Sequence, residues 1–596
     1  MLEKKAALSL EHAVNICKQH SVGTALHSDI VFFSLPYWDI YTPFSAVPCL
    51  VGVLQEKGWK AQQIDIGILY FHELFIKRRR LAWALIKSKF FYHEKVEPFE
   101  SSGVHSYEEY LESIDWLSKD KMDLAALRAA YPTLNDFQRG VLSAFYGALW
   151  INKRKRSNRL HLRLPQLLEG YDFTPFFNVI SRFNLFPILN NLPPVAGISI
   201  TSLDQLAASC LWAIFLKKLH PDITLIAGGS CTIILRNCNR QAWEQFFDFF
   251  DYVCTGEGET CTEMLVNHIY NGVYELGEIP NLAYRAGDTV TCTMEAVENV
   301  EALPPPCYVG IDQSLYLTPE PMLSYQTSRG CFWGKCAFCD FDKKWRSNFR
   351  QKSIEKVNAD LKFLHTTYAV NNFTFVDEAI EPKFFSRWIP ELEKEAFSQY
   401  IHWLAYMKVS PHYSDELIAR AKRCGLTMVM LGVETFNQRL LRFIRKGILA
   451  KNSVQNLNCF HANGVKTHAW LMGLLPSQTK EELIADFTTI KKCIDDIDNV
   501  YMGSFILFPS TDIFSQPHKF NIIQISEAKD IHYDGYTFSS TYNGQEIDIE
   551  KLKKYLNGTI RPFISKKKFI TNRYDRFFDD KFFAEKNTVL KQQGKK

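Results

Sequence analysis

Three cysteines are crowded into a short segment near the middle of the chain. Residues 329–339 read RGCFWGKCAFC and contain Cys331, Cys336 and Cys339. A structural zinc site needs four ligands, usually as two close pairs, and no second Cys or His pair lies nearby. A disulfide requires an oxidising compartment and would leave one thiol over. Three thiolates on an iron–sulfur cluster would instead leave one iron open to a further ligand.

The composition is that of an ordinary globular chain. Its 596 residues exceed what one hydrophobic core holds, so we expect about three domains. The formal net charge of +4 is too small to indicate a nucleic-acid partner. We expect no membrane association and no signal peptide, because no long apolar segment occurs and the N-terminus is typical of a helix. The fifteen cysteines lack pairing spacings, which favours reduced thiols and a cytoplasmic location.

The first half alternates apolar strands with helical patterns, which predicts an α/β fold. The strands end in small or polar residues, where parallel sheets bind ligands. We expect a Rossmann-like, doubly wound domain over 1–275 with a helical insertion at about 72–190, which serves either as a structural addition or as a lid over a substrate. The predicted strands are 29–36, 59–68, 195–200, 224–230 and 251–259, and the predicted helices include 203–219 and 239–249.

The second half begins with a connector and continues with a regular alternation of strands and helices. The connector, 276–320, carries a hairpin signal at 286–289 and three prolines at 304–306. Six strand–helix units over 321–515 predict a partial (β/α)6 barrel with its chemistry at the C-terminal ends of the strands. Residues 516–596 are expected to form a C-terminal cap. The predicted strands are 323–329, 372–377, 401–407, 427–434, 465–474 and 501–508.

Cys331 follows the first of these barrel strands, and the segment resembles the radical S-adenosylmethionine (SAM) superfamily. The usual spacing there is C-x3-C-x2-C, whereas this chain has C-x4-C-x2-C, and we expect the extra residue to bulge from the loop. The resemblance implies a [4Fe–4S] cluster on Cys331, Cys336 and Cys339, with SAM on the fourth iron. It also implies cleavage of SAM to methionine and a 5'-deoxyadenosyl radical, with Phe338 close to the adenine.

The resemblance extends to the ends of later strands and implies further contacts with SAM. Asp377 and Glu378 are the implied ligands of its amino group, and Lys408 is a candidate for its carboxylate. Glu434 ends the fourth strand facing SAM. Residues 470–483 resemble the fifth strand and turn, which form a hydrophobic shelf for adenine.

The front domain, directly upstream of such a barrel, resembles the cobalamin-binding radical SAM class. The alternative is a doubly wound domain that has lost its ligand. The first strand end, SLPYWDIYTP at 34–43, contains no His, so the resemblance implies a cobalt without a His ligand on its lower face. The residues implied to contact cobalamin lie at strand ends and are Pro36, Tyr37, Ser199, Thr201, Ser202, Gly228, Gly229, Ser230, Gly256, Glu257, Gly258 and Glu259.

Within that class, the pattern is similar to the C-methyltransferases that mature ribosomally synthesised peptides. The shared features are the helical insertion, TSRGCFWG at 327–334, and RSNFRQKSIEKV at 346–357. The resemblance implies natural-product biosynthesis, in which a methyl group passes from SAM through methylcobalamin to an unactivated carbon of a peptide or small molecule. It also implies an electron donor such as a flavodoxin or ferredoxin. The alternatives are a radical rearrangement, oxidation or ring contraction without methyl transfer, and a corrinoid-binding sensor or carrier.

Overall fold

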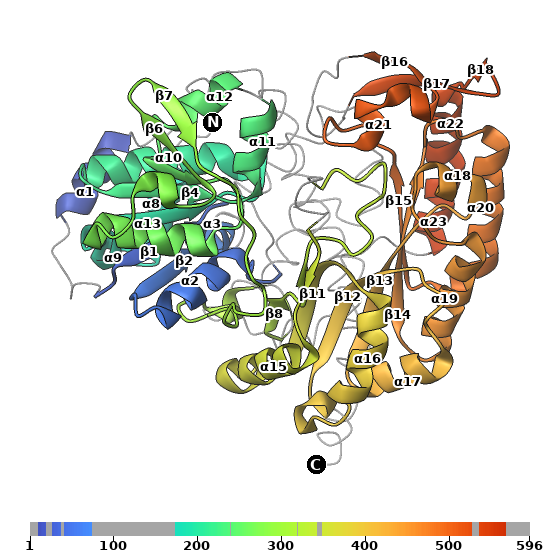
Figure 1. Cartoon of the computed structure of the whole chain (residues 1–596), viewed down its shortest axis with the longest axis horizontal. Coiled ribbons are helices and arrows are strands. Elements are labelled where there is room, and N and C mark those ends of the chain that lie inside the picture. Colours follow the sequence, from blue (N-terminus) through green and yellow to red (C-terminus); the bar gives the residue numbers. More distant parts are fainter. Residues whose placement is uncertain are drawn as a thin grey trace, which may run out of the picture. The chain divides into compact units, whose positions relative to one another are not determined.

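The chain is described by a computed structural model and divides into two compact units (Figure 1). One unit contains residues 1–298 and 303–319, and the other contains 299–302 and 320–596. Tyr37 and most of the expected insertion, 74–172, lie outside the described residues. The structure describes residues 10–19, 27–36, 41–73, 173–238, 240–316, 318, 320–341, 348–526 and 536–567.

The first unit is built on a seven-stranded sheet with the order β2-β1-β3-β4-β5-β6-β7. The first five strands in this order run parallel, and β6 and β7 add an antiparallel hairpin. The order 2-1-3-4-5 is one of those found in doubly wound sheets. The strands are β1 (Ile30–Ser34), β2 (Ala61–Asp65), β3 (Val195–Ser199), β4 (Thr224–Gly228), β5 (Tyr252–Cys254), β6 (Leu282–Ala286) and β7 (Thr289–Cys292).

Helices cover both faces of this sheet, and β1 shows why. Successive side chains of a strand point to opposite faces. Phe32 packs in one core with α2 (Ala46–Glu56) and α13 (Glu259–Asn271). Phe33 instead meets Trp212 of α10 (Leu203–Leu219), with their ring centroids 5.6 Å apart. The other helices of this unit are α1 (Leu10–Gln19), α3 (Ile66–Phe71), α8 (Thr174–Arg182), α9 (Phe186–Asn190), α11 (Ser230–Cys238) and α12 (Arg240–Phe246).

Two segments differ from the sequence prediction. The predicted strand 224–230 ends at Gly228, and α11, which the sequence did not indicate, begins at Ser230. The helix expected over 239–249 is present as the shorter α12. The expected connector contains β6 and β7, followed by a segment that packs on the first unit. There Gln63 Nε2 donates to the carbonyl oxygens of Cys307 (2.7 Å) and Val309 (2.9 Å). Much of the connector therefore belongs to the first unit.

The second unit contains a six-stranded parallel sheet in which each strand lies beside the next one along the chain. This order is the one that a partial (β/α)6 barrel requires. Figure 1 shows the strands with their connecting helices. The strands are β8 (Met322–Tyr325), β11 (Asn372–Ile380), β12 (His402–Lys408), β13 (Leu426–Glu434), β14 (Lys466–Gly473) and β15 (Asn499–Ser504).

The connecting helices pack on one face of this sheet through a buried aromatic core. Phe375 of β11, Trp388 of α16 and Trp403 of β12 lie in mutual contact, with ring centroids 5.1–5.7 Å apart. The neighbouring side chains of each strand therefore point to the opposite face. The helices are α15 (Ile354–Tyr368), α16 (Pro382–Leu392), α17 (Asp415–Arg423), α18 (Gln438–Phe443), α19 (Ala450–Ala462) and α20 (Lys480–Cys493).

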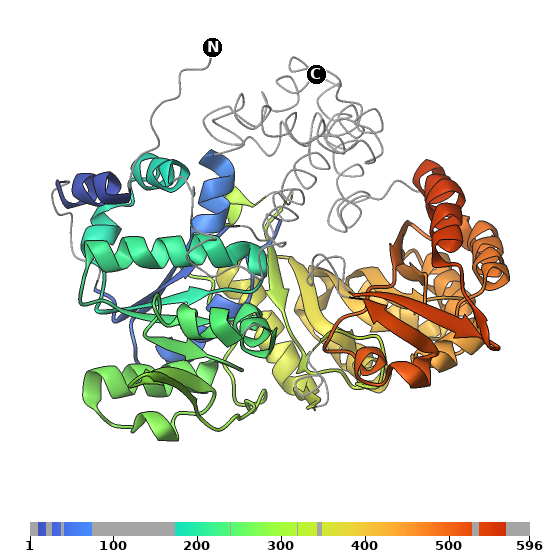
Figure 2. The same cartoon turned by 90° about the horizontal axis from the view of Figure 1, so that it is seen from above.

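A smaller C-terminal region follows β15 and is visible in red in Figure 2. It contains a three-stranded sheet with the order β16-β17-β18. None of the helices in the described part of the chain combines the length and the apolar composition needed to cross a membrane. The elements of this region are α21 (Asp512–Ser515), β16 (Ile522–Ser526), β17 (Thr537–Tyr542), β18 (Gln545–Glu546), α22 (Ile549–Tyr555) and α23 (Arg561–Lys567).

Gly425, which precedes β13, offers a test of the barrel packing. Its φ is +87°, and a Cβ there would overlap the carbonyl oxygen of Ile401. Gly544 has φ +78° with nothing within 4 Å of an added Cβ, so Gly544→Ala carries the same backbone strain without the clash. Overpacking against backbone costs about 2 kcal/mol. Gly425→Ala should therefore melt roughly 5 °C below Gly544→Ala by calorimetry. Equal melting temperatures would contradict the packing.

Candidate active site

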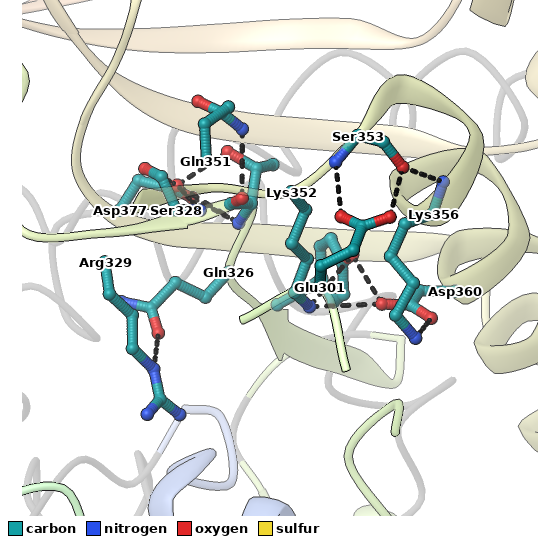
Figure 3. A network of polar contacts seen from close by, with 12 residues as sticks. Glu301, Gln326, Ser328, Arg329, Gln351, Lys352, Ser353, Lys356, Asp360 and Asp377 are labelled. Atoms are coloured by element: carbon teal, nitrogen blue, oxygen red, sulfur yellow. Dashed lines mark hydrogen bonds and ion pairs between the residues drawn. The ribbon is translucent and has the colours of Figure 1, made fainter. Parts of the chain in front are cut away.

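One buried carboxylate fixes the start of the cysteine loop. Asp377 of β11 is 1% exposed, and its Oδ1 accepts hydrogen bonds from the amides of Thr327 (3.0 Å) and Ser328 (2.6 Å). The same oxygen accepts from both hydroxyls, at 2.6 and 2.7 Å (Figure 3). Burial raises the pKa of Asp377, and these hydrogen bonds partly offset that rise. The sequence indicated a contact with SAM, which stays a prediction, whereas these bonds give Asp377 a positioning role that the sequence did not indicate.

A two-stranded ribbon holds the same loop from its other side. β9 (Ser328–Arg329) pairs antiparallel with β10 (Arg350–Gln351). Gln351 Nε2 and the Lys352 amide both donate to the carbonyl oxygen of Thr327, at 2.9 and 3.0 Å. Gln351 and Lys352, from the segment 346–357, therefore bind Thr327, which also donates to Asp377.

A buried polar network anchors this ribbon to α15 (Figure 3). Asp360, 2% exposed, accepts from Lys352 (3.1 Å), from Lys356 (2.7 Å) and from the hydroxyl of Tyr325 (2.8 Å). Glu301 accepts from the amide (2.7 Å) and hydroxyl (2.6 Å) of Ser353, the residue that caps α15. The KS-x-E-x-V pattern at 352–357 therefore has a structural explanation in this chain.

The cysteine loop itself is docked on the turn that follows α18. The Ala337 amide donates to the carbonyl oxygen of Ile444 (2.9 Å), and Trp333 Nε1 donates to that of Arg445 (2.9 Å). The Lys408 ammonium lies 4.3 Å from the centre of the Trp333 ring. Gly447, with φ +67°, leaves the space that the indole occupies. Trp333 lies between Cys331 and Cys336, the interval that is one residue longer than usual. The longer interval is therefore anchored on the turn after α18.

The three thiols fit a cluster better than a single ion. Cys331, Cys336 and Cys339 are all half-buried and unoxidised. In the described part of the chain, no three His, Cys, Asp or Glu side chains are close enough to bind one metal ion together. An iron–sulfur cluster places its thiolates on different irons, so they need not converge on one point. Burial raises the pKa of Cys336 to about 11, which nearby Lys446 opposes, so binding must displace its proton.

Two lysines and a glutamate surround this loop. Lys446 Nζ forms an ion pair of 2.7 Å with Glu434 Oε1, and both side chains are nearly buried. Burial lowers the pKa of Lys446, but Glu434 and Cys336 outweigh it and leave the pKa raised. Burial and then Lys446 lower the pKa of Lys408 to about 8. Lys446 was not identified from the sequence, where it lies twelve residues after Glu434 among other basic residues.

Glu378 lies on β11 beyond Asp377 and is exposed. Burial of its carboxyl group, followed by the charges of Asp340 and Asp377, raises its pKa to about 7. Because the residue as a whole is exposed, solvent reduces this rise in the pKa of Glu378. A cationic ligand at this position would favour the ionised form.

An apolar cluster adjoins the last cysteine. Phe338, the residue before Cys339, and Met472 both pack against a buried cluster that contains Leu475 and Phe505. Lys446 Nζ lies 5.7 Å from the centre of the Phe338 ring. The predicted adenine shelf at 470–483 thus contributes Met472 and Leu475 to the same cluster as Phe338.

In the first unit, the predicted cobalamin contacts gather at one edge of the sheet. Ser34, Ser199 and Gly228 are register partners at the C-terminal ends of β1, β3 and β4. Gly229, with φ +102°, runs so close to the next chain segment that a Cβ would lie 2.5 Å from the Ile200 carbonyl oxygen. Ser230 Oγ donates to the Thr201 carbonyl oxygen (2.7 Å). These residues therefore form one small-residue edge.

A buried glutamine joins two of the loops at this edge. Gln205 Oε1 accepts from the amides of Thr201 (2.8 Å) and Ser202 (3.1 Å). Its Nε2 donates to the carbonyl oxygen of Leu35 (2.8 Å), the neighbour of buried Pro36. Gln205 was not identified from the sequence, where it is one of many polar residues in a helix.

The loop after β5 contains the remaining predicted contacts. Glu257 Oε2 accepts from the Glu298 amide (2.5 Å), so this carboxylate already has a structural partner. Gly258 caps α13, Glu259 is buried in its first turn, and Gly256 is half-buried. A contact of these residues with cobalamin stays a prediction.

The second unit contains a segment that matches a known protein family. Residues 325–490 match the model of the Radical SAM superfamily, so the chain contains a radical SAM domain. An uncharacterized methyltransferase of Pyrococcus horikoshii, PH0819, is 24% identical over 411 residues, covering 66% of this chain and 83% of that protein.

Two solved structures share the fold. TsrM from Kitasatospora setae, a radical SAM methyltransferase with cobalamin and a [4Fe–4S] cluster bound, has a TM-score of 0.51 at 13% identity and covers 82% of this chain and 77% of that one. OxsB, a cobalamin-dependent SAM radical enzyme with aqua-cobalamin bound, has a TM-score of 0.56 at 13% identity and covers 94% of this chain and 71% of that one.

The docking of Trp333 generates a prediction for cluster assembly. Gly447→Ala would place a methyl group inside the indole ring, whereas Gly464→Ala, at the same φ of +67°, would meet only Lys422 Cε at 3.9 Å. Displacing Trp333 moves the segment between Cys331 and Cys336. Iron and sulfide content after anaerobic reconstitution should fall to about half or less in Gly447→Ala, because overpacking shifts the backbone, and should match wild type in Gly464→Ala. Equal content in both variants would contradict the role of Trp333.

Proposed function

We propose that this chain, which contains a radical SAM domain, is a cobalamin-dependent methyltransferase acting on an unactivated carbon. The observation that carries the proposal is the three-cysteine loop, held by Asp377 at the ends of the barrel strands and beside the Glu434–Lys446 ion pair. The fold likeness to TsrM, and the relative named as a methyltransferase, support methyl transfer as the reaction.

Cys331, Cys336 and Cys339 would hold a [4Fe–4S] cluster. When bound, the cluster supplies the electron that cleaves SAM to a 5'-deoxyadenosyl radical, and cobalamin supplies the methyl group. The chain's own contribution is positional. Asp377 keeps the first residues of the loop in place, and Trp333 keeps the interval between Cys331 and Cys336 against Gly447.

The charged residues around the loop match the ends of a SAM molecule. Glu378 would accept the amino group, whose positive charge would favour loss of the Glu378 proton. Lys408 and Lys446 make the surroundings positive and would attract the carboxylate of SAM. Glu434 holds Lys446 in place at 2.7 Å. Phe338, Met472 and Leu475 provide the apolar surface for adenine.

The first unit would bind cobalamin at the small-residue edge of its sheet. Gly228 and Gly229 lack side chains where a flat macrocycle would approach, and the close contact of Gly229 with Ile200 leaves no room for a Cβ. Gln205 keeps the loops at the ends of β1 and β3 together. The absence of His from residues 34–43 supports a cobalt without a His ligand from that loop.

The substrate would be a peptide or another natural-product precursor. TsrM has been solved with a tryptophan substrate, which supports an amino-acid-like acceptor here. The main rival is radical chemistry without methyl transfer, such as rearrangement, oxidation or ring contraction.

Product analysis separates these reactions. The reconstituted enzyme is incubated anaerobically with SAM and a reductant, with and without hydroxocobalamin, and 5'-deoxyadenosine and S-adenosylhomocysteine are quantified. Methyl transfer predicts both products, with S-adenosylhomocysteine dependent on cobalamin, because one SAM is cleaved and another gives up its methyl group. Formation of 5'-deoxyadenosine alone, regardless of cobalamin, would contradict methyl transfer and favour the rival.

A further inference from the structure

A row of side chains crosses the barrel sheet at the level of Lys408. In the strand register, Lys408 of β12 is the partner of Gly432, Gly432 of Trp470, and Trp470 of Tyr501. Residues paired in register point to the same face of a sheet. These four residues therefore share one face.

That face is the one on which the cysteine loop lies. Lys408 reaches Trp333 of the loop, and a Cβ at Gly432 would lie 2.6 Å from Lys446 Nζ. The helices cover the opposite face. A Cβ added at Gly473 would meet Met502 of β15 and Leu483 of α20 there. Trp470 and Tyr501 thus lie on the inner face, together with the candidate active site.

Three rings make a continuous aromatic surface on this face. His468 and Trp470 stack with centroids 4.9 Å apart and planes inclined by 9°. Trp470 and Tyr501 are 4.8 Å apart and inclined by 51°. Tyr501, on the edge strand β15, is 43% exposed and therefore accessible to a ligand. The Tyr501 ring leans over Gly503, where an added Cβ would lie 3.0 Å from its Cε1.

The indole of Trp470 has a donor available for a ligand. Its Nε1 is buried and has no hydrogen-bond partner among the residues that the structure describes. A buried donor without a partner is destabilising, and buried indole N–H groups normally find one. A bound group that accepts this hydrogen bond would remove that cost.

The charges near the three rings indicate which kind of ligand this surface binds. The cation in the row, Lys408, already donates to the Gly447 carbonyl oxygen (2.8 Å) and lies on Trp333. The indole of Trp470 carries no charge, and Arg561, the cation near Tyr501, already donates to the Met502 carbonyl oxygen (3.1 Å) and the Ser504 hydroxyl (3.1 Å). An uncharged planar group can stack on Trp470 and Tyr501 while one of its polar atoms accepts from the indole.

We propose that His468, Trp470 and Tyr501 form the acceptor-substrate site and bind a neutral aromatic side chain with a nearby carbonyl, as in an aromatic residue of a peptide. This inference rests on the proposed function, for which it names the substrate class. Met472 and Phe338 pack against the same apolar cluster, and Trp470 is the previous inward-facing residue of β14. Trp470 is also the first residue of the predicted adenine shelf, so the aromatic surface adjoins the expected adenine site at this residue.

Binding of two probes tests the site on the reconstituted enzyme with SAM and cobalamin present. Isothermal titration should show N-acetyl-L-tryptophanamide binding at least about tenfold more tightly than N-acetyl-L-leucinamide, because only the former stacks. Trp470→Phe keeps a ring but loses the donor and should weaken the tryptophan probe about tenfold. Tyr501→Leu should weaken it similarly. Met502→Leu, on the opposite face of β15, is the matched control and should bind as wild type does.

Three outcomes would overturn the proposal. They are equal affinity for both probes, no binding of either, and unchanged tryptophan-probe affinity in both Trp470→Phe and Tyr501→Leu. A loss of SAM binding that parallels the loss of probe binding would likewise assign Trp470 to the cofactor. The proposed function is read separately, from 5'-deoxyadenosine and S-adenosylhomocysteine formed by the unmodified enzyme, so its failure is distinguishable from failure of this site.

Discussion

The candidate active site depends on the buried carboxylate of Asp377. It joins the end of β11 to Thr327 and Ser328, which precede it by about fifty residues in the chain. Leaving a buried hydrogen-bonding group without its partner costs about 1–3 kcal/mol, because the group remains buried without a bond. Because breaking these hydrogen bonds is unfavourable, the first residues of the cysteine loop stay at the end of the sheet. Everything that the three thiols can bind depends on that placement.

A second constraint acts within the interval between Cys331 and Cys336. Trp333 is held by the Arg445 carbonyl oxygen, by the Lys408 ammonium and by the space at Gly447. The loop is therefore tied both to β11 and to the turn after α18. Lys446, which is near Cys336, forms an ion pair with Glu434.

Much of this architecture could be predicted from the sequence, because it follows from local patterns. The six barrel strands and the helix at 203–219 follow the periodicity of their apolar residues, and the structure confirms a parallel sheet in chain order. The helix α11 was missed, since AGGS was read only as a ligand loop and a helix beginning at Ser230 leaves little local signal. Pairings between distant segments were also missed. The bonds of Asp377 to Ser328, and of Gln205 to Leu35, depend on how strands associate and have no signature in either segment alone.

The central claim is that Cys331, Cys336 and Cys339 hold a [4Fe–4S] cluster with one iron open to SAM. Electron paramagnetic resonance of the reduced, reconstituted protein tests it most directly, with spectra recorded before and after adding SAM. The account predicts a [4Fe–4S] signal that changes on addition of SAM and is lost in each single Cys→Ala variant. A signal that SAM leaves unchanged, or that persists when any one of these cysteines is replaced, would contradict it.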